Sequence, residues 1–326
     1  MNIMVLGAGA WGTAIARLLC EEKNHVTLWG HDAAHLHDLQ KSFRNERYLP
    51  GIELPRTLKL ETNLSHAVAH AELIVLAVPS KAFRKVTESL KNFSGIAISV
   101  TKGIEHHSSL TMCGVLAENA PLAKLAALSG PSLALEVARG VPTAIVTASD
   151  DAATANVVQK LFHRPAFRVY TSSDLHGVEL GGALKNVIAI AAGVCDGLGF
   201  GDNSKAALVT RGLAEMRRLG VACGAQADTF SGLSGLGDLM VTCFSKLSRN
   251  RGLGERLGRG EKIETILAST KSIAEGYPTA KSAHALARKL KIATPIIDEI
   301  YAALYEGKDP AKALHNLTAR ESKAED

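Results

Sequence analysis

The chain has 326 residues, of which 46% are hydrophobic and 21% charged, and its formal net charge is +5 at pH 7. This composition indicates a folded globular protein rather than a disordered one, and the length fits two domains better than one core. The charge is too small to indicate a nucleic-acid binder, but it suits a small anionic ligand. The five cysteines include no Cys-x-x-Cys pair, and no signal peptide precedes the first apolar run, so we expect free thiols in a cytoplasmic protein.

A glycine-rich turn follows the first predicted strand, residues 3–6. It reads Gly7-Ala8-Gly9-Ala10-Trp11-Gly12, and residues 13–19 have a helical pattern. Strand, Gly-x-Gly-x-x-Gly and helix form the fingerprint of a dinucleotide-binding fold. Gly7 allows the tight turn, Gly9 lets the backbone approach a pyrophosphate, and Gly12 lets the helix pack close to the strand. Amide groups at the start of the helix then face the anion.

Short β-branched runs alternate with helical patterns through the first half of the chain. Predicted strands cover residues 3–6, 26–29, 73–78, 97–100, 124–129 and 143–147, and residues 167–170 are a further candidate. This rhythm is typical of an α/β fold, with a mostly parallel sheet and helices on both faces. We therefore predict a Rossmann-like dinucleotide-binding domain over residues 1–172.

The second half shows helical periodicity and no clear strand. Ser173 or Asp174 is a candidate N-cap for a long helix that runs to Cys195, and further helices fit residues 204–219, 252–259, 263–267, 279–290 and 295–305. Glycines at 177, 181, 182 and 193 each cost about 1 kcal/mol of helix propensity, which indicates close packing or a nearby ligand. The apolar stretch 187–195 is too short for membrane insertion. We predict an all-helical substrate-binding and catalytic domain over residues 173–326, with frayed residues at its end.

Polar groups follow three of the predicted strands. Ser80 comes after the third strand, Lys102 after the fourth, and Gly130 and Ser132 after the fifth. Ligands of open α/β sheets bind beyond the carboxyl ends of the strands, so these groups are expected to line one crevice between the two domains. A solvated Lys102 is the competing interpretation.

Three charged residues of the helical half are candidates for chemistry. Lys185 interrupts an apolar helix, where a lysine is costly unless it is paired or faces a cleft, so it is a candidate general acid. Asp238 ends a glycine loop and is placed to hold Lys185. Arg249, between Ser248 and Asn250, suits a phosphate, which a guanidinium meets with two parallel hydrogen bonds. A snorkelling lysine, a helix-capping aspartate and a solvated basic turn remain the alternatives.

Other chemistries lack their motifs. The histidines at 31, 35 and 37 and at 106 and 107 have no cysteine or carboxylate set to complete a metal site, so we predict no metal. No Gly-x-Ser-x-Gly elbow of a serine hydrolase is present, and the glycines at 252 and 254 lack the Gly-Lys-Ser/Thr ending of a P-loop.

The ordered set of motifs resembles the bacterial-type NAD(P)-dependent glycerol-3-phosphate dehydrogenases. The segments that carry the resemblance are Gly-Ala-Gly-Ala-Trp-Gly-Thr-Ala at 7–14, Tyr-Leu-Pro-Gly at 48–51, Thr-Lys-Gly-Ile-Glu at 101–105, Ser-Gly-Pro-Ser at 129–132, Glu-Leu-Gly-Gly-Ala-Leu-Lys-Asn at 179–186, Gly-Leu-Gly-Asp-Leu at 235–239, Ser-Arg-Asn-Arg at 248–251 and Ala-Glu-Gly at 274–276. The resemblance covers nearly the whole chain. Ala10 stands where many members have serine, so one hydroxyl contact to the cofactor is expected to be missing.

The resemblance implies reversible hydride transfer between NAD(P)H and dihydroxyacetone phosphate, giving sn-glycerol 3-phosphate for phospholipid synthesis. It implies Lys185 as the catalytic acid. The substrate-contacting positions that it implies are Lys102, Gly130, Ser132, Asp238, Ser248, Arg249 and Asn250. The cofactor-contacting positions, beside the glycines at 7, 9 and 12, are Ala10, Trp11, His31, Tyr48, Lys102, Ala134, Arg249, Ile273 and Glu275.

The choice between cofactors depends on the end of the second strand, which reads Trp29-Gly30-His31-Asp32. An acidic residue there favours NAD, whereas His31 can contact a 2′-phosphate if Asp32 points away. We expect NADP(H) to be preferred and NAD also to be accepted. Two other hypotheses stay open: a related dehydrogenase of a 3-hydroxy acid or sugar acid, and a non-catalytic NAD(P)H-sensing regulator. The sequence leaves a homodimer open.

Overall fold

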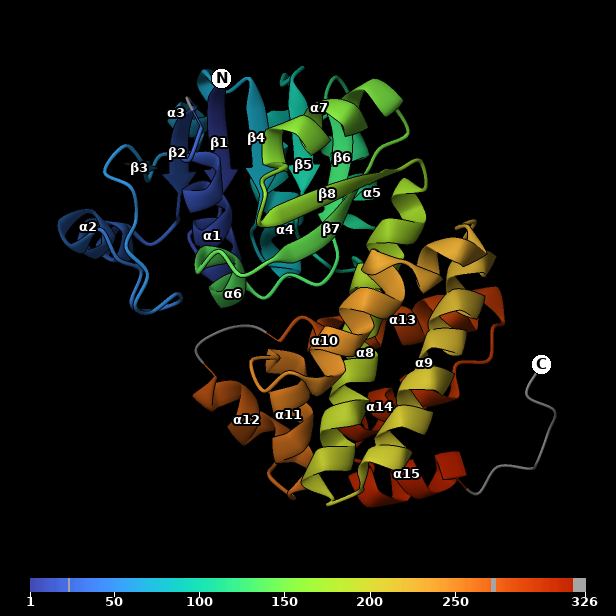
Figure 1. The fold of residues 1–326 in the computed structure, drawn as a ribbon. Coiled ribbons are helices and arrows are strands. Elements are labelled where there is room, and N and C mark those ends of the chain that lie inside the picture. Colours follow the sequence, from blue (N-terminus) through green and yellow to red (C-terminus); the bar gives the residue numbers. More distant parts are fainter. Residues whose placement is uncertain (23, 271–273, 319–326) are drawn as a thin grey trace.

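The computed structural model describes residues 1–22, 24–270 and 274–318. A twisted sheet flanked by helices forms one half, and a bundle of helices forms the other (Figure 1). The N-terminus lies in the sheet half (Figure 1). Ile273 and the end of the chain predicted to fray, from residue 319 onward, lie outside the described residues.

Eight strands form one sheet in the order β3-β2-β1-β4-β5-β6-β7-β8. Neighbouring strands are parallel except for β6 and β7, which are antiparallel. The order of the first six strands is that of a dinucleotide-binding fold, so the fold-class prediction is confirmed. The strands are β1 (Asn2–Leu6), β2 (His25–Trp29), β3 (Lys59–Glu61), β4 (Leu73–Leu76), β5 (Ile96–Ser99), β6 (Lys124–Ser129), β7 (Thr143–Ala148) and β8 (Phe167–Ser172).

Helices cover both faces of this sheet because successive side chains of a strand point to opposite sides. Ile3 and Val5 of β1 belong to one buried cluster, and Met4 and Leu6 belong to another. The first cluster includes residues of α1 (Ala10–Leu19), α2 (Ala33–Ser42), α6 (Ala134–Ala138) and α7 (Ala152–Phe162). The second includes residues of α3 (Leu64–Ala69), α4 (Ser80–Thr87), α5 (Met112–Asn119) and the short 3-10 helix η1 (Glu88–Leu90).

The helical half is built around α8 (Leu175–Gly197), which is buried along almost its whole length (Figure 1). Its neighbours are α9 (Asp202–Ala222), α10 (Asp238–Phe244), α11 (Arg249–Gly258), α12 (Ile263–Ser269), α13 (Gly276–Leu290), α14 (Pro295–Tyr305) and α15 (Pro310–Thr318), with the short helices η2 (Ala227–Ser231) and η3 (Leu233–Gly237) before α10. By length and hydropathy α8 could cross a membrane, so the prediction that this apolar stretch is too short was wrong. Its apolar surface is instead packed inside the protein, as in the core helix of a bundle.

Most predicted elements are present, with limits that differ by a few residues. The predicted strand 124–129 and helix 295–305 match β6 and α14. Three elements, β3, α10 and α15, were not predicted from the sequence. In the described residues after Ser172 every element is a helix, as expected, and Asp174 is the N-cap of α8, where its carboxylate accepts a hydrogen bond from the Gly177 amide.

Candidate active site

The glycine turn has the geometry that its sequence predicts. Gly7 has a φ of +124°, a left-handed conformation that favours glycine, and a Cβ there would lie 2.6 Å from the Ala77 carbonyl oxygen at the end of β4. A Cβ on Gly12 would overlap the Gly7 carbonyl oxygen, whereas Gly9 has no described atom within 4 Å of that position. Gly9 is the N-cap of α1 and supplies no side chain to the first-turn amides. Ala10 and Trp11 open this helix, so a pyrophosphate has both room and donors here.

A buried asparagine that the sequence analysis missed fixes a second loop against this turn. Asn45 donates from Nδ2 to the Ala8 carbonyl oxygen (3.1 Å) and to Thr13 Oγ1 (2.7 Å). Its Oδ1 accepts from the Tyr48 amide at 3.2 Å. The predicted cofactor residue Tyr48 is therefore held beside the glycine turn.

Two lysines from different halves of the chain share one buried carboxylate. Lys102 Nζ, beyond β5, lies 2.5 Å from Asp238 Oδ2, and Lys185 Nζ of α8 lies 3.0 Å from Asp238 Oδ1. Lys185 also donates to Thr242 Oγ1 at 2.6 Å, and that hydroxyl donates to the Asp238 carbonyl oxygen. The side chain of Lys185 is 7% exposed, so it is not a snorkelling surface lysine. Asp238 is the first residue of α10 and does not cap it.

The electrostatics of this cluster prepare Lys185 to release a proton near neutral pH. Burial, with the neighbouring charge of Lys102, lowers the pKa of Lys185 to about 8, although Asp238 opposes the shift. Burial raises the pKa of Asp238, but the charges of Lys102 and Lys185 outweigh it and leave that pKa below its usual value. The carboxylate is therefore ionised and holds both ammonium groups in place.

The strand-end segments meet at this cluster as predicted. Lys102 Nζ donates to the Gly130 carbonyl oxygen at 3.3 Å, and Ser132 Oγ donates to the same oxygen at 2.9 Å. The neighbouring Thr101 Oγ1 donates to the Val78 carbonyl oxygen at 2.7 Å. These bonds connect Lys185 through Lys102 to the end of β4, on which Gly7 of the glycine turn packs.

The predicted phosphate segment begins α11. Ser248 caps this helix by accepting from the Arg251 amide, and Arg249 is exposed. The surrounding protein disfavours its charged form and lowers the pKa of Arg249, and the charge of Glu275 opposes that shift. Asn250 is buried: its Nδ2 donates to Asn186 Oδ1 (2.8 Å) and its Oδ1 accepts from the Gly276 amide (2.9 Å). Asn250 thus ties α11 to the residue that follows Lys185.

Glu275, a predicted cofactor residue, joins the two halves of the chain. Its carboxylate accepts from the Ser80 amide at 3.1 Å and from Ser80 Oγ at 2.5 Å, at the first turn of α4. Burial raises the pKa of Glu275, and the two hydrogen bonds from Ser80 oppose the shift. The sequence predicted that Ser80 lies at the end of its strand. It did not predict that Ser80 is bonded to Glu275, which lies 195 residues away.

Two predicted cofactor residues lie on either side of the glycine turn. His31 is exposed, between the end of β2 and Asp32, the N-cap of α2. Ala134 begins α6 and is partly buried against the cluster that contains α1. Among the described residues, no group of three or more histidine, cysteine or acidic side chains is arranged to hold a metal.

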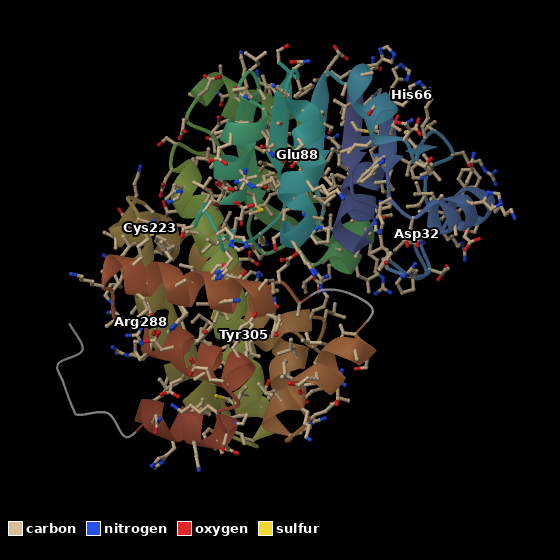
Figure 2. The ribbon with its side chains drawn as sticks, turned by 180° about the vertical axis from the view of Figure 1, so that it is seen from behind. Asp32, His66, Glu88, Cys223, Arg288 and Tyr305 are labelled. Atoms are coloured by element: carbon tan, nitrogen blue, oxygen red, sulfur yellow. The ribbon has the colours of Figure 1, made fainter. Side chains whose placement is uncertain are left out.

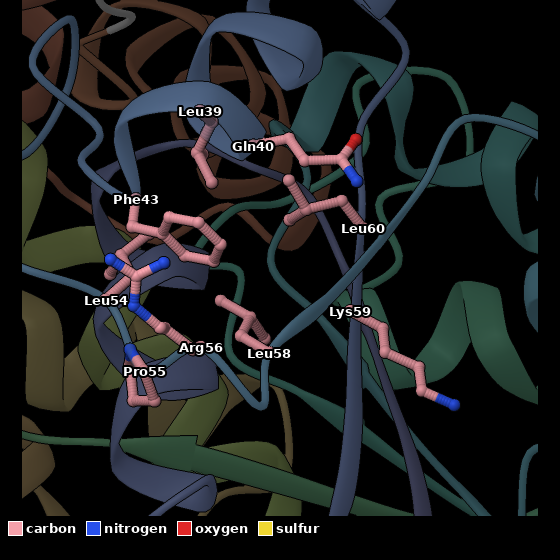
Figure 3. A pocket seen from close by; sticks show the side chains of 9 residues that line it. All are labelled: Leu39, Gln40, Phe43, Leu54, Pro55, Arg56, Leu58, Lys59 and Leu60. Atoms are coloured by element: carbon pink, nitrogen blue, oxygen red, sulfur yellow. The ribbon is translucent and has the colours of Figure 1, made fainter.

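One open cavity lies apart from this cluster. Its volume is about 350 Å³, and its lining side chains include Phe43 and Arg56 (Figure 3). None of the predicted site residues lines it.

Comparison with known proteins agrees with this geometry. Residues 2–155 match the family model described as NAD-dependent glycerol-3-phosphate dehydrogenase N-terminus, and residues 174–315 match the corresponding C-terminus. The chain belongs to the NAD-dependent glycerol-3-phosphate dehydrogenase family. The boundary between these two matches spans β8, the last strand before the helical half.

Relatives of this family resemble the chain over its full length. It is 48% identical to glycerol-3-phosphate dehydrogenase (NAD(P)+) of Syntrophotalea carbinolica, with 100% of this chain and 99% of that protein covered. It is also 48% identical to the enzyme of the same name from Desulfotalea psychrophila, with 99% and 98% covered. The crystal structure of glycerol-3-phosphate dehydrogenase from Coxiella burnetii superposes with a TM-score of 0.95 at 38% identity, covering 98% of this chain and 99% of that one.

Proposed function

We propose that this protein catalyses reversible hydride transfer between NAD(P)H and dihydroxyacetone phosphate, giving sn-glycerol 3-phosphate. The observation that carries the proposal is the buried Lys185, which meets Lys102 and the strand-end groups of the nucleotide-binding half through Asp238. The full-length relatives bear the name of this activity. The division into a nucleotide-binding domain, residues 1–172, and a helical domain, residues 173–326, follows from the same arrangement.

In the direction of reduction, Lys185 acts as the general acid. The bound cofactor supplies the hydride, and the substrate carbonyl oxygen then gains a proton from Lys185 Nζ. A lysine whose pKa is about 8 is mostly protonated at neutral pH, yet it releases its proton more readily than an ordinary lysine. Lys102 and Asp238 fix its position, and Lys102 adds positive charge beside the developing alkoxide.

The substrate's phosphate is assigned to Arg249, at the start of α11. A guanidinium keeps its charge at every physiological pH and offers two parallel donors to phosphate oxygens. Gly130 and Ser132 border the same crevice from the nucleotide-binding half. In this assignment Ser248 and Asn250 shape the segment around Arg249 rather than offering free side chains, because both are bonded within the protein.

The cell biology is inferred from the reaction. The product would supply phospholipid synthesis in the cytoplasm, and the partner of the protein is a small phosphorylated substrate. The five free cysteines agree with a reducing compartment. The chain can also form a homodimer in this proposal, and light scattering of the purified protein would distinguish the mass of a dimer from that of a monomer.

A direct assay decides between this function and its alternatives. Purified protein should oxidise NADPH when given dihydroxyacetone phosphate, and far more slowly when given dihydroxyacetone or a phosphate-free 3-keto acid. The Arg249→Ala variant should raise KM for the phosphorylated ketone. Turnover of a phosphate-free acid that is insensitive to Arg249→Ala would support the related hydroxy-acid dehydrogenase. Tight cofactor binding without turnover of any ketone would support a regulator.

A further inference from the structure

The acidic residue after β2 has no free oxygen in this structure. Asp32 Oδ1 accepts from the His35 amide at 3.0 Å, as the N-cap of α2, and Asp32 Oδ2 pairs with Arg47 Nη1 at 3.0 Å. Figure 2 labels Asp32 beside α2, in the sheet half. An enzyme that selects NAD uses a carboxylate at this place to accept hydrogen bonds from the ribose hydroxyls. Here each oxygen of that carboxylate already accepts a hydrogen bond from the protein.

The partner of Asp32 is itself held close to the cofactor crevice. Arg47 lies in the loop that Asn45 ties to the glycine turn, and its guanidinium sits 5.1 Å from the centre of the Tyr48 ring. The side chain of Arg47 is 50% exposed, so an incoming anion can reach it. His31, also exposed, adds a second donor at the same end of β2.

We propose that Arg47 is the residue that selects NADP(H) over NAD(H) in this chain, by binding the 2′-phosphate of the adenosine ribose. The proposal rests on the function proposed above and names a residue that the family resemblance did not assign. The 2′ position of the ribose is recognised at the carboxyl end of the second strand, and Arg47 lies 3.0 Å from the side chain that occupies this place.

Charge and geometry favour the exchange of partners. The Asp32–Arg47 pair is exposed, so breaking it costs little, and a phosphate offers the guanidinium two parallel, charge-assisted bonds. Stacking on Tyr48 keeps the guanidinium in place while its partner changes. Asp32 Oδ1 stays bonded to the His35 amide at the start of α2, so the aspartate keeps its place when Arg47 turns to the phosphate. NAD(H) lacks the 2′-phosphate, so it gains nothing from Arg47.

The test is a binding titration, which does not depend on turnover. NADPH and NADH are titrated into the whole protein without substrate, and nicotinamide fluorescence is followed for wild type, Arg47→Gln, Arg47→Lys and Arg56→Gln. Arg56 is the matched control: it stacks 4.7 Å from the Phe43 ring centre in the cavity of Figure 3, where no cofactor residue is assigned. Circular dichroism melting checks that each variant is folded.

We expect Arg47→Gln to raise Kd for NADPH roughly tenfold, the effect of losing one charged hydrogen-bonding partner. Its Kd for NADH should not rise, because NADH makes no bond to Arg47 and the variant leaves Asp32 Oδ2 free for the ribose hydroxyls. Arg47→Lys should recover part of the NADPH affinity, and Arg56→Gln should change neither value. Equal weakening of both cofactors, or no change in either, would overturn the assignment. Wild-type protein that binds neither cofactor would instead remove the proposed function, and this inference with it.

Discussion

At the scale of single residues, the site depends on one carboxylate between two ammonium groups. Removing Asp238 would leave Lys102 and Lys185 close together without a counter-charge, which disfavours the protonated form of both. Burial lowers the pKa of Lys185 below that of a free lysine, and the charge of Asp238 limits the fall. The charge state of Lys185 can therefore be followed by comparing the pH dependence of wild type and an Asp238 variant.

The pH dependence of ketone reduction reports on this pair. A general acid works in its protonated form, so kcat/KM for dihydroxyacetone phosphate should fall as the pH rises through about 8, the pKa of Lys185. In Asp238→Asn the alkaline limb should move to lower pH by about one unit or more, since the charge that raises the Lys185 pKa is gone. Steady-state rates between pH 6 and pH 10 measure the alkaline limb for wild type and for Asp238→Asn. Superimposable profiles would mean that Lys185 is not the titrating acid.

Part of this cluster could be predicted from the sequence. A lysine in an apolar helix is costly without a partner, and that cost led to Lys185. Asp238 was a candidate partner because it ends a glycine loop. Thr242 was missed because α10 was not predicted. The glycines at 232, 235 and 237 look like a loop, but the last two lie in the short helix η3, which runs directly into α10, and Gly232 is its N-cap. Asn45 was missed because its partners, the Ala8 carbonyl oxygen and Thr13, lie more than thirty residues away.

At the scale of elements, the position of Lys185 depends on how closely α8 crosses α11. The crossing has glycine on both helices: a Cβ on Gly193 would overlap the Arg251 carbonyl oxygen, and one on Gly254 would overlap the Ile190 carbonyl oxygen. Both obstacles are backbone atoms, which cannot rotate away. The glycines that weaken α8 as an isolated helix therefore allow its packing, as the sequence had indicated.

Adding one methyl group at this crossing should separate the helices. We expect Gly193→Ala to lower the free energy of unfolding by about 2 kcal/mol or more, the range seen when a packed core is overfilled. Gly252→Ala is the matched control on α11, because no described atom lies within 4 Å of its added Cβ. That variant should gain up to about 1 kcal/mol from helix propensity. Urea unfolding compares the two, and equal effects would argue against a tight crossing.

Element limits were predictable where patterning and capping agree. Pro295 opens α14 and the apolar run of β6 is bounded clearly, so both limits matched. The strand β3 has only three residues at the edge of the sheet, too few for a periodicity. The antiparallel direction of β7 was not predictable either, because direction depends on the path of the connection and leaves no mark in the strand's own residues.

At the scale of the whole molecule, the helical half is bonded into the sheet half at two places. Glu179, near the start of α8, accepts from the Cys113 amide of α5 at 2.8 Å, and Glu275, the N-cap of α13, accepts from Ser80 of α4. The sequence rhythm predicted two halves of different architecture. It could not predict these contacts, which join residues 66 and 195 positions apart. The Glu179 bond holds α8, which carries Lys185, against α5.

The buried Glu179 should make stability depend on pH. Burial raises its pKa from 4.5 to about 7, so folding favours the protonated form, and the stability that this contributes at low pH is lost as the pH rises through about 7. Glu179→Gln keeps an acceptor but cannot ionise. Between pH 5.5 and pH 8 its free energy of unfolding should therefore rise relative to wild type by about 2 kcal/mol, since one pKa unit is about 1.4 kcal/mol and part of the wild-type loss has already occurred at pH 5.5. Urea unfolding at both values measures the gain. Burial also raises the pKa of Glu215 to about 7, but Glu215 is present in both proteins, so its contribution to the difference in stability cancels.

A single-turnover experiment tests most directly whether Lys185 supplies the proton to the substrate carbonyl oxygen. Wild type and Lys185→Met are loaded with NADPH, mixed rapidly with dihydroxyacetone phosphate, and followed through one turnover by nicotinamide absorbance. We predict that hydride transfer slows by at least about a hundredfold in the variant, because general acid catalysis contributes that much, while Kd for NADPH changes little. A variant that reduces the ketone at close to the wild-type rate would contradict the assignment of Lys185.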